Sequence, residues 1–286
     1  MALYSNYGKH KSKGKLRTAI IILLLAAFAI VALFPIYFMI ISSFGDPIEA
    51  GAVSYSLLPQ KFTLESYKFF FNYSPYSVRW LLNSLLVAAV ITTSNVIFCG
   101  MAGYAFAKIK FPGRKPAFWA LLCAMMVPYQ AIQVPLYILV VNVLKISNTY
   151  AALILPGLCG IYNVFLAKQF MSSLPLEIIE SAKMEGCNQL QIFVRIIAPL
   201  SKTVLAVMAI TTFMDNWNTF FWPFLVTNTM DMQTIQVGLK NFRFANTTYF
   251  APMMAGATVS ALPMFILFFS LQKYFLQGVT VGAVKG

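Results

Sequence analysis

Six long apolar runs constrain the fold of this 286-residue chain more than any other feature. The first lies between Thr18 and Ile41 and holds no charged residue. The other five cover approximately residues 81–107, 117–144, 150–170, 200–226 and 250–275. A helix needs about 20 apolar residues to cross the hydrocarbon core of a bilayer, and the runs lack the alternation of period two that strands show. The sequence therefore predicts an all-α integral membrane protein with six transmembrane helices.

The composition agrees with a lipid environment. Hydrophobic residues make up 59% of the chain and charged residues 10%, whereas a soluble domain carries about 25% charged residues. The net charge of +13 is also compatible with nucleic-acid binding. However, the basic residues cluster beside apolar runs, where they act as topology signals and meet lipid headgroups. We therefore expect a lipid membrane around the chain and no nucleic-acid partner.

The first run follows five Lys and Arg residues, so a cleaved signal peptide is an alternative to a permanent span. The run is longer than the apolar core of a signal peptide, and no clear small-residue cleavage site follows it. We expect a single transmembrane domain over residues 1–286. It would contain a first span at 17–43, a five-span core at 80–276 and a C-terminal tail at 277–286.

The distribution of positive charge predicts the orientation. Fifteen of the 21 Lys and Arg residues fall in the two termini and in the segments after the second and fourth runs, and six fall in the other segments. Cytoplasmic segments carry the excess of Lys and Arg in membrane proteins. Both termini and the long loop at 172–199 are therefore predicted to be cytoplasmic.

This loop gathers three of the chain's 8 acidic residues into one polar stretch. The sequence SSLPLEIIESAKMEG predicts a short helix, because Pro175 is tolerated in a first turn, Glu177 complements the helix dipole and Gly186 ends the helix. A second helix is predicted from Asn188, with Gln191 completing its cap.

Ile178, Ile179 and Ala182 are expected on one face of the first loop helix. Such an amphipathic helix either lies on lipid or docks into a partner protein. An ordinary solvated loop is the alternative. Against it, a plain connection needs only a few residues, and this one uses the 28 residues of 172–199.

The loop also carries a spaced motif. Permease subunits of ABC importers have a cytoplasmic signature of E-A-A, three residues, G, nine residues and I-x-L-P. At that spacing this chain has Glu180, Ser181, Ala182, Gly186, Ile196, Ala198 and Pro199. It departs from the signature at Ser181 and Ala198. The segments FTLESY (62–67), NSL (83–85), DNWNTFFWPFLV (215–226) and GVTVGAVKG (278–286) are similar to the MalG-like branch. Over essentially its whole length, the chain resembles a MalG-like permease subunit of carbohydrate ABC importers.

This resemblance implies the type I ABC importer (MetI-like) permease fold in a bacterial cytoplasmic membrane. The implied partners are a homologous second permease, two ABC ATPase subunits and an extracytoplasmic sugar-binding protein. The implied ATPase-coupling residues are Glu180, Ser181, Ala182, Gly186, Ile196 and Pro199. Glu180 would be a polar anchor, Ala182 a close-contact position and Gly186 the turn. Ile196 and Pro199 would set the return into the fifth span.

The chain is expected to be non-catalytic. Its stretch GKHKSKGK lacks the spacing of a nucleotide-binding P-loop. One His and four widely spaced Cys give neither a catalytic nor a metal-ligand pattern, and we interpret the cysteines as small buried hydrophobic residues. No cofactor or metal is therefore predicted in this chain, and ATP and Mg would bind to the partner ATPase subunits.

The outer half of the fifth run is both polar and aromatic. Its candidate substrate-pathway residues are Asp215, Asn216, Asn218 and Trp222. An acid within a membrane marks a functional position, because it is costly to expose to lipid. Amides and rings suit the hydroxyl groups and C–H faces of a sugar. An aromatic belt with an internally paired Asp215 is the alternative, and Trp217 and Phe221 are expected to pack at the side or touch lipid.

Two further regions carry weaker signals. In the third run, Gln130 and Gln133 share a helix face and are pathway candidates, with polarity between packed helices as the alternative. The outer segments are 44–79 and 227–249. The second resembles the loop with which such permeases meet a binding protein, and a plain surface loop is the alternative.

The sequence therefore predicts a permease subunit of an ATP-driven, binding-protein-dependent ABC importer for a sugar, with an oligosaccharide preferred. A non-sugar solute is the first alternative. An ATP-independent secondary transporter or channel is the second, and the absence of an internal repeat and the structured inner loop argue against it. A membrane enzyme is the third, and it lacks a catalytic cluster.

Overall fold

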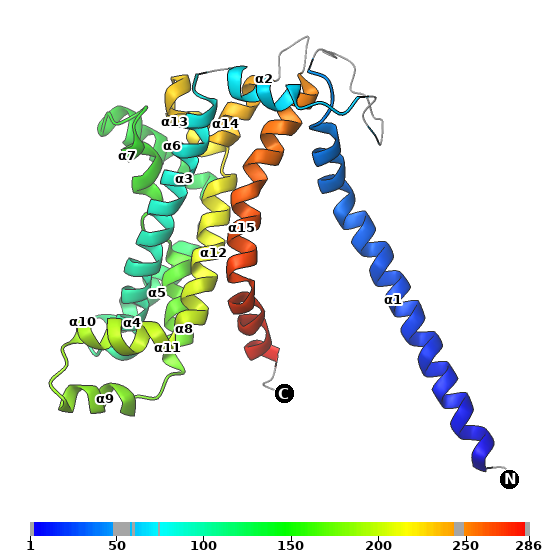
Figure 1. Ribbon diagram of the computed structural model, residues 1–286. Coiled ribbons are helices and arrows are strands. Elements are labelled where there is room, and N and C mark those ends of the chain that lie inside the picture. Colours follow the sequence, from blue (N-terminus) through cyan, green and yellow to red (C-terminus); the bar gives the residue numbers. More distant parts are fainter. Residues whose placement is uncertain (1–2, 48–57, 59–60, 74, 243–248, 284–286) are drawn as a thin grey trace. The chain divides into compact units, whose positions relative to one another are not determined.

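The structure is a computed structural model in which residues 3–47, 58, 61–73, 75–242 and 249–283 are described. Helices are the only regular secondary structure of these residues (Figure 1). The chain divides into two compact units, Met1–Phe70 with Phe242–Val259 and Phe71–Asn241 with Ser260–Gly286. The all-α class predicted from the apolar runs is confirmed.

The smaller unit contains α1 (Leu3–Ser42), most of α2 (Glu65–Tyr73) and the first turns of α15 (Phe250–Ala283). The apolar part of α1, Arg17–Ser42, is 26 residues long and matches the first predicted span. Its large apolar side chains are mostly exposed, as expected for a helix surrounded by lipid. The turn after α1 is fixed by the hydroxyl of Tyr67, 2.7 Å from that of Ser43, and by Ser66, which donates to the Gly45 carbonyl at 2.6 Å.

The larger unit holds most of the other helices. In chain order they are α3 (Ser77–Ser94), η1 (Asn95–Cys99), α4 (Gly100–Lys108), α5 (Arg114–Met125), α6 (Tyr129–Ile138), η2 (Leu139–Val143), α7 (Tyr150–Ile154), η3 (Leu155–Gly157), α8 (Ile161–Ser172), α9 (Glu177–Met184), α10 (Gln189–Ile192), η4 (Phe193–Ile197), α11 (Ala198–Leu200), α12 (Lys202–Asn218), α13 (Phe221–Val226), η5 (Met230–Met232) and α14 (Ile235–Leu239). The short η6 (Lys240–Phe242) follows α14.

Within the described residues, four helices are long and apolar enough to cross a membrane: Arg17–Ser42, Ser77–Lys108, Tyr150–Ser172 and Phe250–Ser270. They match the first, second, fourth and sixth predicted runs. The number rises to six if each of two bent helix pairs forms one span.

The third predicted run, 117–144, is broken rather than continuous. The helix α5 and the α6–η2 helix meet at 96° across residues 126–128. Pro128 has an extended backbone with a ψ of 133°. Because a residue before proline is disfavoured in the helical region, Val127 is a poor continuation of α5. The proline therefore separates the two helices and precedes the first turn of α6.

The fifth predicted run, 200–226, is also not one straight helix. The helical arm Gln189–Leu200 meets α12 at 83°. At the other end α12 stops at Asn218, and Thr219 is extended with a ψ of 121°. Pro223 has no N–H to donate to the Thr219 carbonyl, so a helix running through this point would lose that hydrogen bond. The predicted run thus forms α12, a break and the short α13.

The two ends of the larger unit carry different elements (Figure 1). Helices α9 and α10 lie at one end, which we call the α9 end, and α13 and α14 lie at the other, the α14 end. The Lys108 ammonium, at the end of α4, donates to the carbonyls of Leu174 and, at 3.2 Å, of Ser172. The basic turn after α4 and the loop at 172–199 therefore share the α9 end, as the charge distribution requires.

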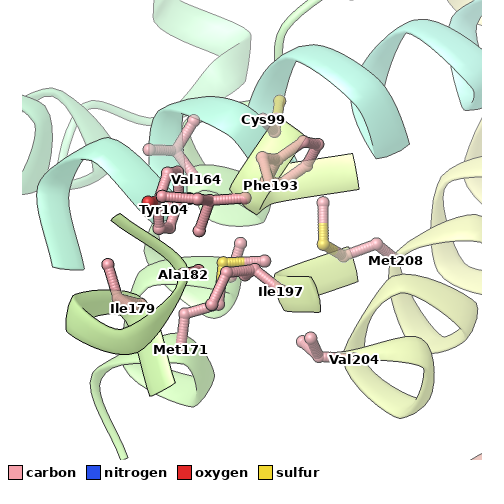
Figure 2. Close-up of a cluster of buried hydrophobic side chains, with 12 residues drawn as sticks. Cys99, Tyr104, Val164, Met171, Ile179, Ala182, Phe193, Ile197, Val204 and Met208 are labelled. Atoms are coloured by element: carbon pink, nitrogen blue, oxygen red, sulfur yellow. The ribbon is translucent and has the colours of Figure 1, made fainter. Parts of the chain in front are cut away.

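One buried cluster joins the loop helix α9 to the bundle (Figure 2). Ile179 and Ala182 of α9 are buried in this cluster together with Tyr104 of α4. Ile197 of η4 and Met208 of α12 belong to the same cluster and are fully buried. Side chains packed this closely move together. The loop helix is therefore part of the same hydrophobic core as the apolar helix α12.

Candidate functional site

Helix α9 has one face buried and one face open at the α9 end. Ile179 is 1% exposed, whereas Glu180 and Ser181 are exposed and Met184 is 89% exposed. The Glu180 carboxylate makes no hydrogen bond or ion pair among the described residues. The outer face thus combines a free carboxylate with a bare apolar side chain. We call this surface, with the turn that follows it, the docking loop.

Two details of the predicted loop helix are corrected. Ile178 is 37% exposed and lies at the edge of the buried face, because it projects about 40° from Ala182 on the side away from Ile179. Ala182 is buried against this chain's own core. Its close contact is therefore with the bundle. The motif implied that Ala182 contacts a partner subunit, but its side chain faces the core of this chain.

Gly186 forms the predicted turn. Its φ is +84°, a left-handed conformation that disfavours any residue with a Cβ. Its N–H donates to the Lys183 carbonyl and the N–H of Cys187 donates to the Ala182 carbonyl, both at 3.0 Å. This pair of bonds is the Schellman arrangement that closes a helix C-terminus. The end of α9 is thus fixed by backbone hydrogen bonds.

The arm after the turn begins with the predicted capping box. The N–H of Gln191 donates to the Asn188 side-chain oxygen, and the Gln191 side-chain oxygen accepts from the Asn188 N–H, each at 2.9 Å. The Tyr104 hydroxyl donates to the Gln189 side chain at 2.8 Å and ties the arm to α4. Ile196 is half-buried on this arm, and Pro199 is exposed just before the bend into α12.

A cavity of about 530 Å³ lies in the other half of the larger unit. It is lined from α6, from the region between α7 and α8, and from the α12–α13 break. Four predicted pathway residues meet there: Asp215, Asn216, Trp222 and Gln133. The remaining lining comes from Tyr129, Leu153, Pro156, Gly157, Thr219, Phe220 and Phe221. The cavity therefore combines a carboxylate, two amides and several aromatic rings.

Two predicted pathway residues are not brought to the cavity. Asn218 does not line it, because it points about 60° from Asp215 on the side opposite Asn216 and Thr219. Gln130 does not line it either and is exposed. Phe221, expected at the side of the helix, lines the cavity and is 50% exposed. The break at Thr219 redirects the chain, so a helical projection from α12 does not hold for Phe221.

Hydrogen bonds fix the cavity walls. The Trp222 indole N–H donates to the Ala152 carbonyl at 3.0 Å, and the Asn216 amide donates to the Thr212 carbonyl at 2.8 Å. Trp217 packs at the side as predicted and donates to the Ser260 carbonyl at 2.9 Å. No ion pair among the described residues includes Asp215, so the internal partner of the aromatic-belt alternative is not found there.

Sequence reasoning missed several lining residues. Tyr129 follows the helix-breaking Pro128, and Thr219 and Phe220 occupy the break before α13. The prolines at 128 and 223 were the available signals, since each lies at the start of a helix that follows a break beside the cavity. The direction of the helix that follows each proline depends on its packing against helices that are distant in the sequence.

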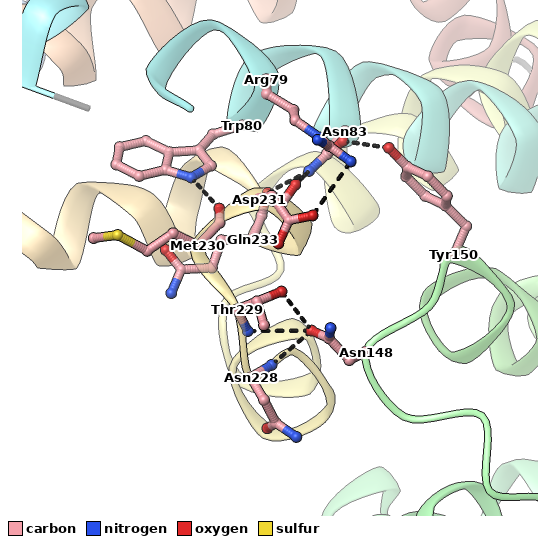
Figure 3. A network of polar contacts seen from close by, with 10 residues as sticks. All are labelled: Arg79, Trp80, Asn83, Asn148, Tyr150, Asn228, Thr229, Met230, Asp231 and Gln233. Atoms are coloured by element: carbon pink, nitrogen blue, oxygen red, sulfur yellow. Dashed lines mark hydrogen bonds and ion pairs between the residues drawn. The ribbon is translucent and has the colours of Figure 1, made fainter. Parts of the chain in front are cut away.

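The segment after α13 is held against the start of α3 (Figure 3). The Trp80 indole N–H donates to the Met230 carbonyl at 2.6 Å, and the Asn83 amide donates to the carbonyls of Asp231 and Gln233 at 2.9 and 2.8 Å. The described part of the predicted outer segment 227–249 is therefore an ordered element, and residues 243–248 lie outside the described residues.

The same segment is joined to the loop before α7. Asn148 adopts a φ of 59°, and its side-chain oxygen accepts from the N–H of Asn228 at 2.9 Å and of Thr229 at 3.2 Å (Figure 3). Asn tolerates this left-handed conformation better than most residues. The α14 end thus presents a fixed surface.

The cysteines differ from the prediction in part. Cys99 is buried, but Cys123 and Cys159 are exposed and Cys187 is half-buried. The sulfur atoms of Cys99 and Cys159 lie 3.5 Å apart, although the residues are 60 positions apart in the sequence. Only Cys99 therefore behaves as a fully buried small hydrophobic residue.

Comparison with known proteins assigns the family. Residues 97–281 match the model of the "binding-protein-dependent transport system inner membrane component" family. The chain is 34% identical over 263 residues to the arabinooligosaccharides transport system permease protein AraQ of Halalkalibacterium halodurans, covering 91% of this chain and 94% of that protein. It is 32% identical to the galactooligosaccharides transport system permease protein GanQ of Bacillus subtilis over 272 residues, 92% of this chain and 94% of that one.

A third relative acts on a different solute by its name. The sn-glycerol-3-phosphate transport system permease protein UgpE of Escherichia coli O1:K1 is 30% identical over 257 residues, 87% of this chain and 91% of UgpE. Among solved structures, one chain of a bacterial ABC transporter that imports the acidic polysaccharide alginate matches with a TM-score of 0.79 and 22% identity, over 91% of this chain and 97% of that chain. The helices of this protein thus follow the fold of an ABC importer permease, and the chain belongs to the family of inner-membrane components of binding-protein-dependent transport systems.

Proposed function

We propose that this chain is a permease subunit of an ATP-driven, binding-protein-dependent importer for an oligosaccharide. It forms half of the pathway and pairs with a homologous permease, two ABC ATPase subunits and an extracytoplasmic sugar-binding protein. The observation that carries the proposal is the docking loop, whose outer face is open and whose inner face belongs to the bundle core.

The docking loop suits an ATPase subunit. Met184 is almost fully exposed at the α9 end, and Leu190 and Val194 of the following arm are each 57% exposed. Apolar side chains exposed together mark a contact surface for another protein. The free carboxylate of Glu180 beside them adds a charge-assisted hydrogen-bond acceptor. ATP and Mg would bind in the ATPase subunits. The conformational change of those subunits would be passed to this chain through the docking loop.

Transmission follows from the shared core. Ile179 and Ala182 of α9 pack in the cluster that contains Met208 of α12. Asp215 lies seven residues further along α12 and reaches the cavity, about 10 Å along the helix axis. A displacement of α9 would therefore move the cavity wall through one stiff helix.

The cavity suits a neutral sugar. Its volume of about 530 Å³ falls within the range of about 300–1,000 Å³ typical of small-molecule sites. Asn216 and Gln133 offer donors and acceptors to hydroxyl groups, and the aromatic rings can stack on the C–H faces of a pyranose or furanose. The lining contains Asp215 and no Lys or Arg among the described residues. This charge disfavours a phosphate or uronate solute, such as those in the names of UgpE and the alginate transporter.

The α9 end is proposed to be cytoplasmic. It carries the basic turn after α4 and the basic residues of the loop at 172–199, and positive charge is retained on the cytoplasmic side. The α14 end would then face outward in the bacterial inner membrane. Its ordered segment, held by Trp80 and Asn83, is the surface proposed for the sugar-binding protein.

Purification of the tagged chain from membranes in mild detergent tests the proposal. A second permease and an ABC ATPase should be recovered with it. Glu180→Lys and Met184→Asp should each lose the ATPase while keeping the second permease. Lys61→Glu, which reverses an exposed charge outside the docking loop, is the matched control and should keep both. Recovery of the chain alone, in a form that transports without ATP, would instead support a secondary transporter.

A further inference from the structure

The fourth span is interrupted where it borders the cavity. Helix α7 passes into the tight turn η3, and residues 158–160 are not helical before α8 begins at Ile161. Pro156 and Gly157 from this interruption line the cavity. Backbone groups freed within a membrane must find partners inside the protein, because lipid offers none.

Asn95 of η1 supplies those partners. Its side chain is 1% exposed. The amide nitrogen donates to the carbonyls of Gly157 at 2.7 Å and Ile91 at 2.9 Å, and the amide oxygen accepts from the N–H of Gly160 at 2.8 Å. One side chain thus bonds a backbone group on each side of the interruption. This needs a donor and an acceptor on the same short tip, which an Asn amide offers and a carboxylate or alkyl group does not.

The contact at Gly160 is close. A Cβ at this position would lie 3.0 Å from the Asn95 amide oxygen and 3.3 Å from the Asn163 amide nitrogen. The two asparagines therefore approach the backbone at a residue that has no side chain. Adding a methyl group there would push the interruption away from Asn95 without changing Asn95 itself.

The same cluster reaches α12. The Asn95 amide oxygen also accepts from the Asn163 amide at 2.9 Å, and the Asn163 amide donates to the Thr212 hydroxyl at 2.9 Å. The Thr212 carbonyl accepts from the amide of Asn216, which lines the cavity. The chain of bonds therefore connects two walls of the cavity, the interruption in the fourth span and helix α12.

We propose that Asn95 is the positioning residue that holds these two walls at the spacing needed for solute binding. Asn95 does not line the cavity and acts through Gly157 and Asn216. Ser94 supports the same interruption, because its hydroxyl donates to the Leu158 carbonyl at 2.9 Å. The inference rests on the proposed sugar-binding role of the cavity.

Two natural thiols report on the bonds between η1 and the interruption without any transport measurement, since the Cys99 thiol itself donates to the Asn95 amide oxygen at 3.3 Å. Cys159 lies in the interruption, and its sulfur is 3.5 Å from that of Cys99 in η1. Copper-phenanthroline oxidises such a pair to a disulfide, and mass spectrometry of the linked peptides measures the rate. Asn95→Leu keeps a similar size and removes both the donor and the acceptor. We expect it to slow cross-linking about fivefold or more, as the loss of buried hydrogen bonds implies.

Asn83→Leu is the matched control. Asn83 lies on α3, is 1% exposed, donates to two carbonyls and accepts from the Tyr150 hydroxyl at 2.6 Å. It therefore has the burial and bonding of Asn95 but lies in the network of the α14 end. Asn83→Leu should leave the cross-linking of Cys99 and Cys159 unchanged.

A second measurement tests sugar binding in the cavity. In the assembled complex, Thr219→Cys places a thiol in the cavity lining, and arabino- or galactooligosaccharide should protect it from a small methanethiosulfonate reagent. Asn95→Leu should raise the half-protecting concentration about tenfold or more, because displacement of binding groups by about 1 Å can have this effect. A parent complex without protection would refute the sugar cavity itself, and the cross-linking rates would still show whether Asn95 holds the interruption.

Gly160→Ala is a second variant that tests the same contact if Asn95→Leu fails to assemble. It should reduce both cross-linking and protection. Unchanged cross-linking in both variants would overturn the inference, as would slower cross-linking with unchanged protection. If both variants fail to assemble while Asn83→Leu assembles, Asn95 serves folding alone and the positioning role is refuted.

Discussion

Substitutions at Gly186 should weaken ATPase binding in a graded order. No atom lies within 4 Å of a Cβ built at Gly186, so a side chain there meets no steric obstacle. The only cost is the φ of +84°, which disfavours an ordinary L-residue by about 1–2 kcal/mol. Since 1.4 kcal/mol is a factor of ten, Gly186→Ala should lower the affinity of the ATPase about 5- to 30-fold. Gly186→Asn should lose less, because Asn adopts this conformation more readily, and Gly186→Val should lose more than Ala.

The assay is a titration of the purified ATPase subunit onto the permease pair in lipid nanodiscs, followed by fluorescence. Gly113→Ala is the matched control. Gly113 has a φ of +79° and also has no atom within 4 Å of its Cβ, but it lies before α5, outside the docking loop. Equal affinities for Gly186→Ala and the parent, or equal losses for Gly186→Ala and Gly113→Ala, would refute the assignment of the docking loop.

Three further predictions concern the cavity, the orientation and the bundle. Asn216→Ala should raise the half-saturating sugar concentration for uptake about tenfold by removing a hydrogen-bonding amide, whereas Asn218→Ala, which does not reach the cavity, should change it little; equal effects would contradict the cavity. In intact cells, an impermeant maleimide should label a cysteine placed at Thr229 and not one at Ser181, and the reverse pattern would overturn the orientation. Gly103→Ala should destabilise the protein by about 1–3 kcal/mol in thermal unfolding, because its Cβ would lie 2.5 Å from the nearest atom of α8; an unchanged midpoint would show that the two helices separate freely.

The parts predicted well from the sequence depend on local chemistry. The capping box at Asn188 and Gln191 and the turn at Gly186 require only residues within a few positions of one another. The second run was found nearly in full, and the helix extends from Ser77 to Lys108. The length of an apolar run and the residues at the ends of a helix are enough to predict such elements, because the thickness of the membrane sets the length of a span.

The parts that were wrong or missed depend on distant packing. Helical projection from Asp215 placed Phe221 outside the pathway, because the break at Thr219 was not anticipated. Asn218 lies within α12, and its angle to Asp215 did not show which side of the helix borders the cavity. The bonds of Trp80 and Asn83 to the segment after α13 join residues about 150 positions apart. No local pattern predicts such pairs. Local sequence also does not show that Ala182 packs into the core of this chain, since that core is formed with distant helices.

ATP-dependent uptake is the most direct test of the central claim. The complex purified with this chain would be reconstituted into liposomes with its binding protein and labelled arabino- or galactooligosaccharide outside. Accumulation should require ATP inside the liposomes and the binding protein outside, and Glu180→Lys should abolish it while the two permeases remain in the membrane. Uptake that proceeds at the same rate without ATP, or that survives Glu180→Lys unchanged, would contradict the account.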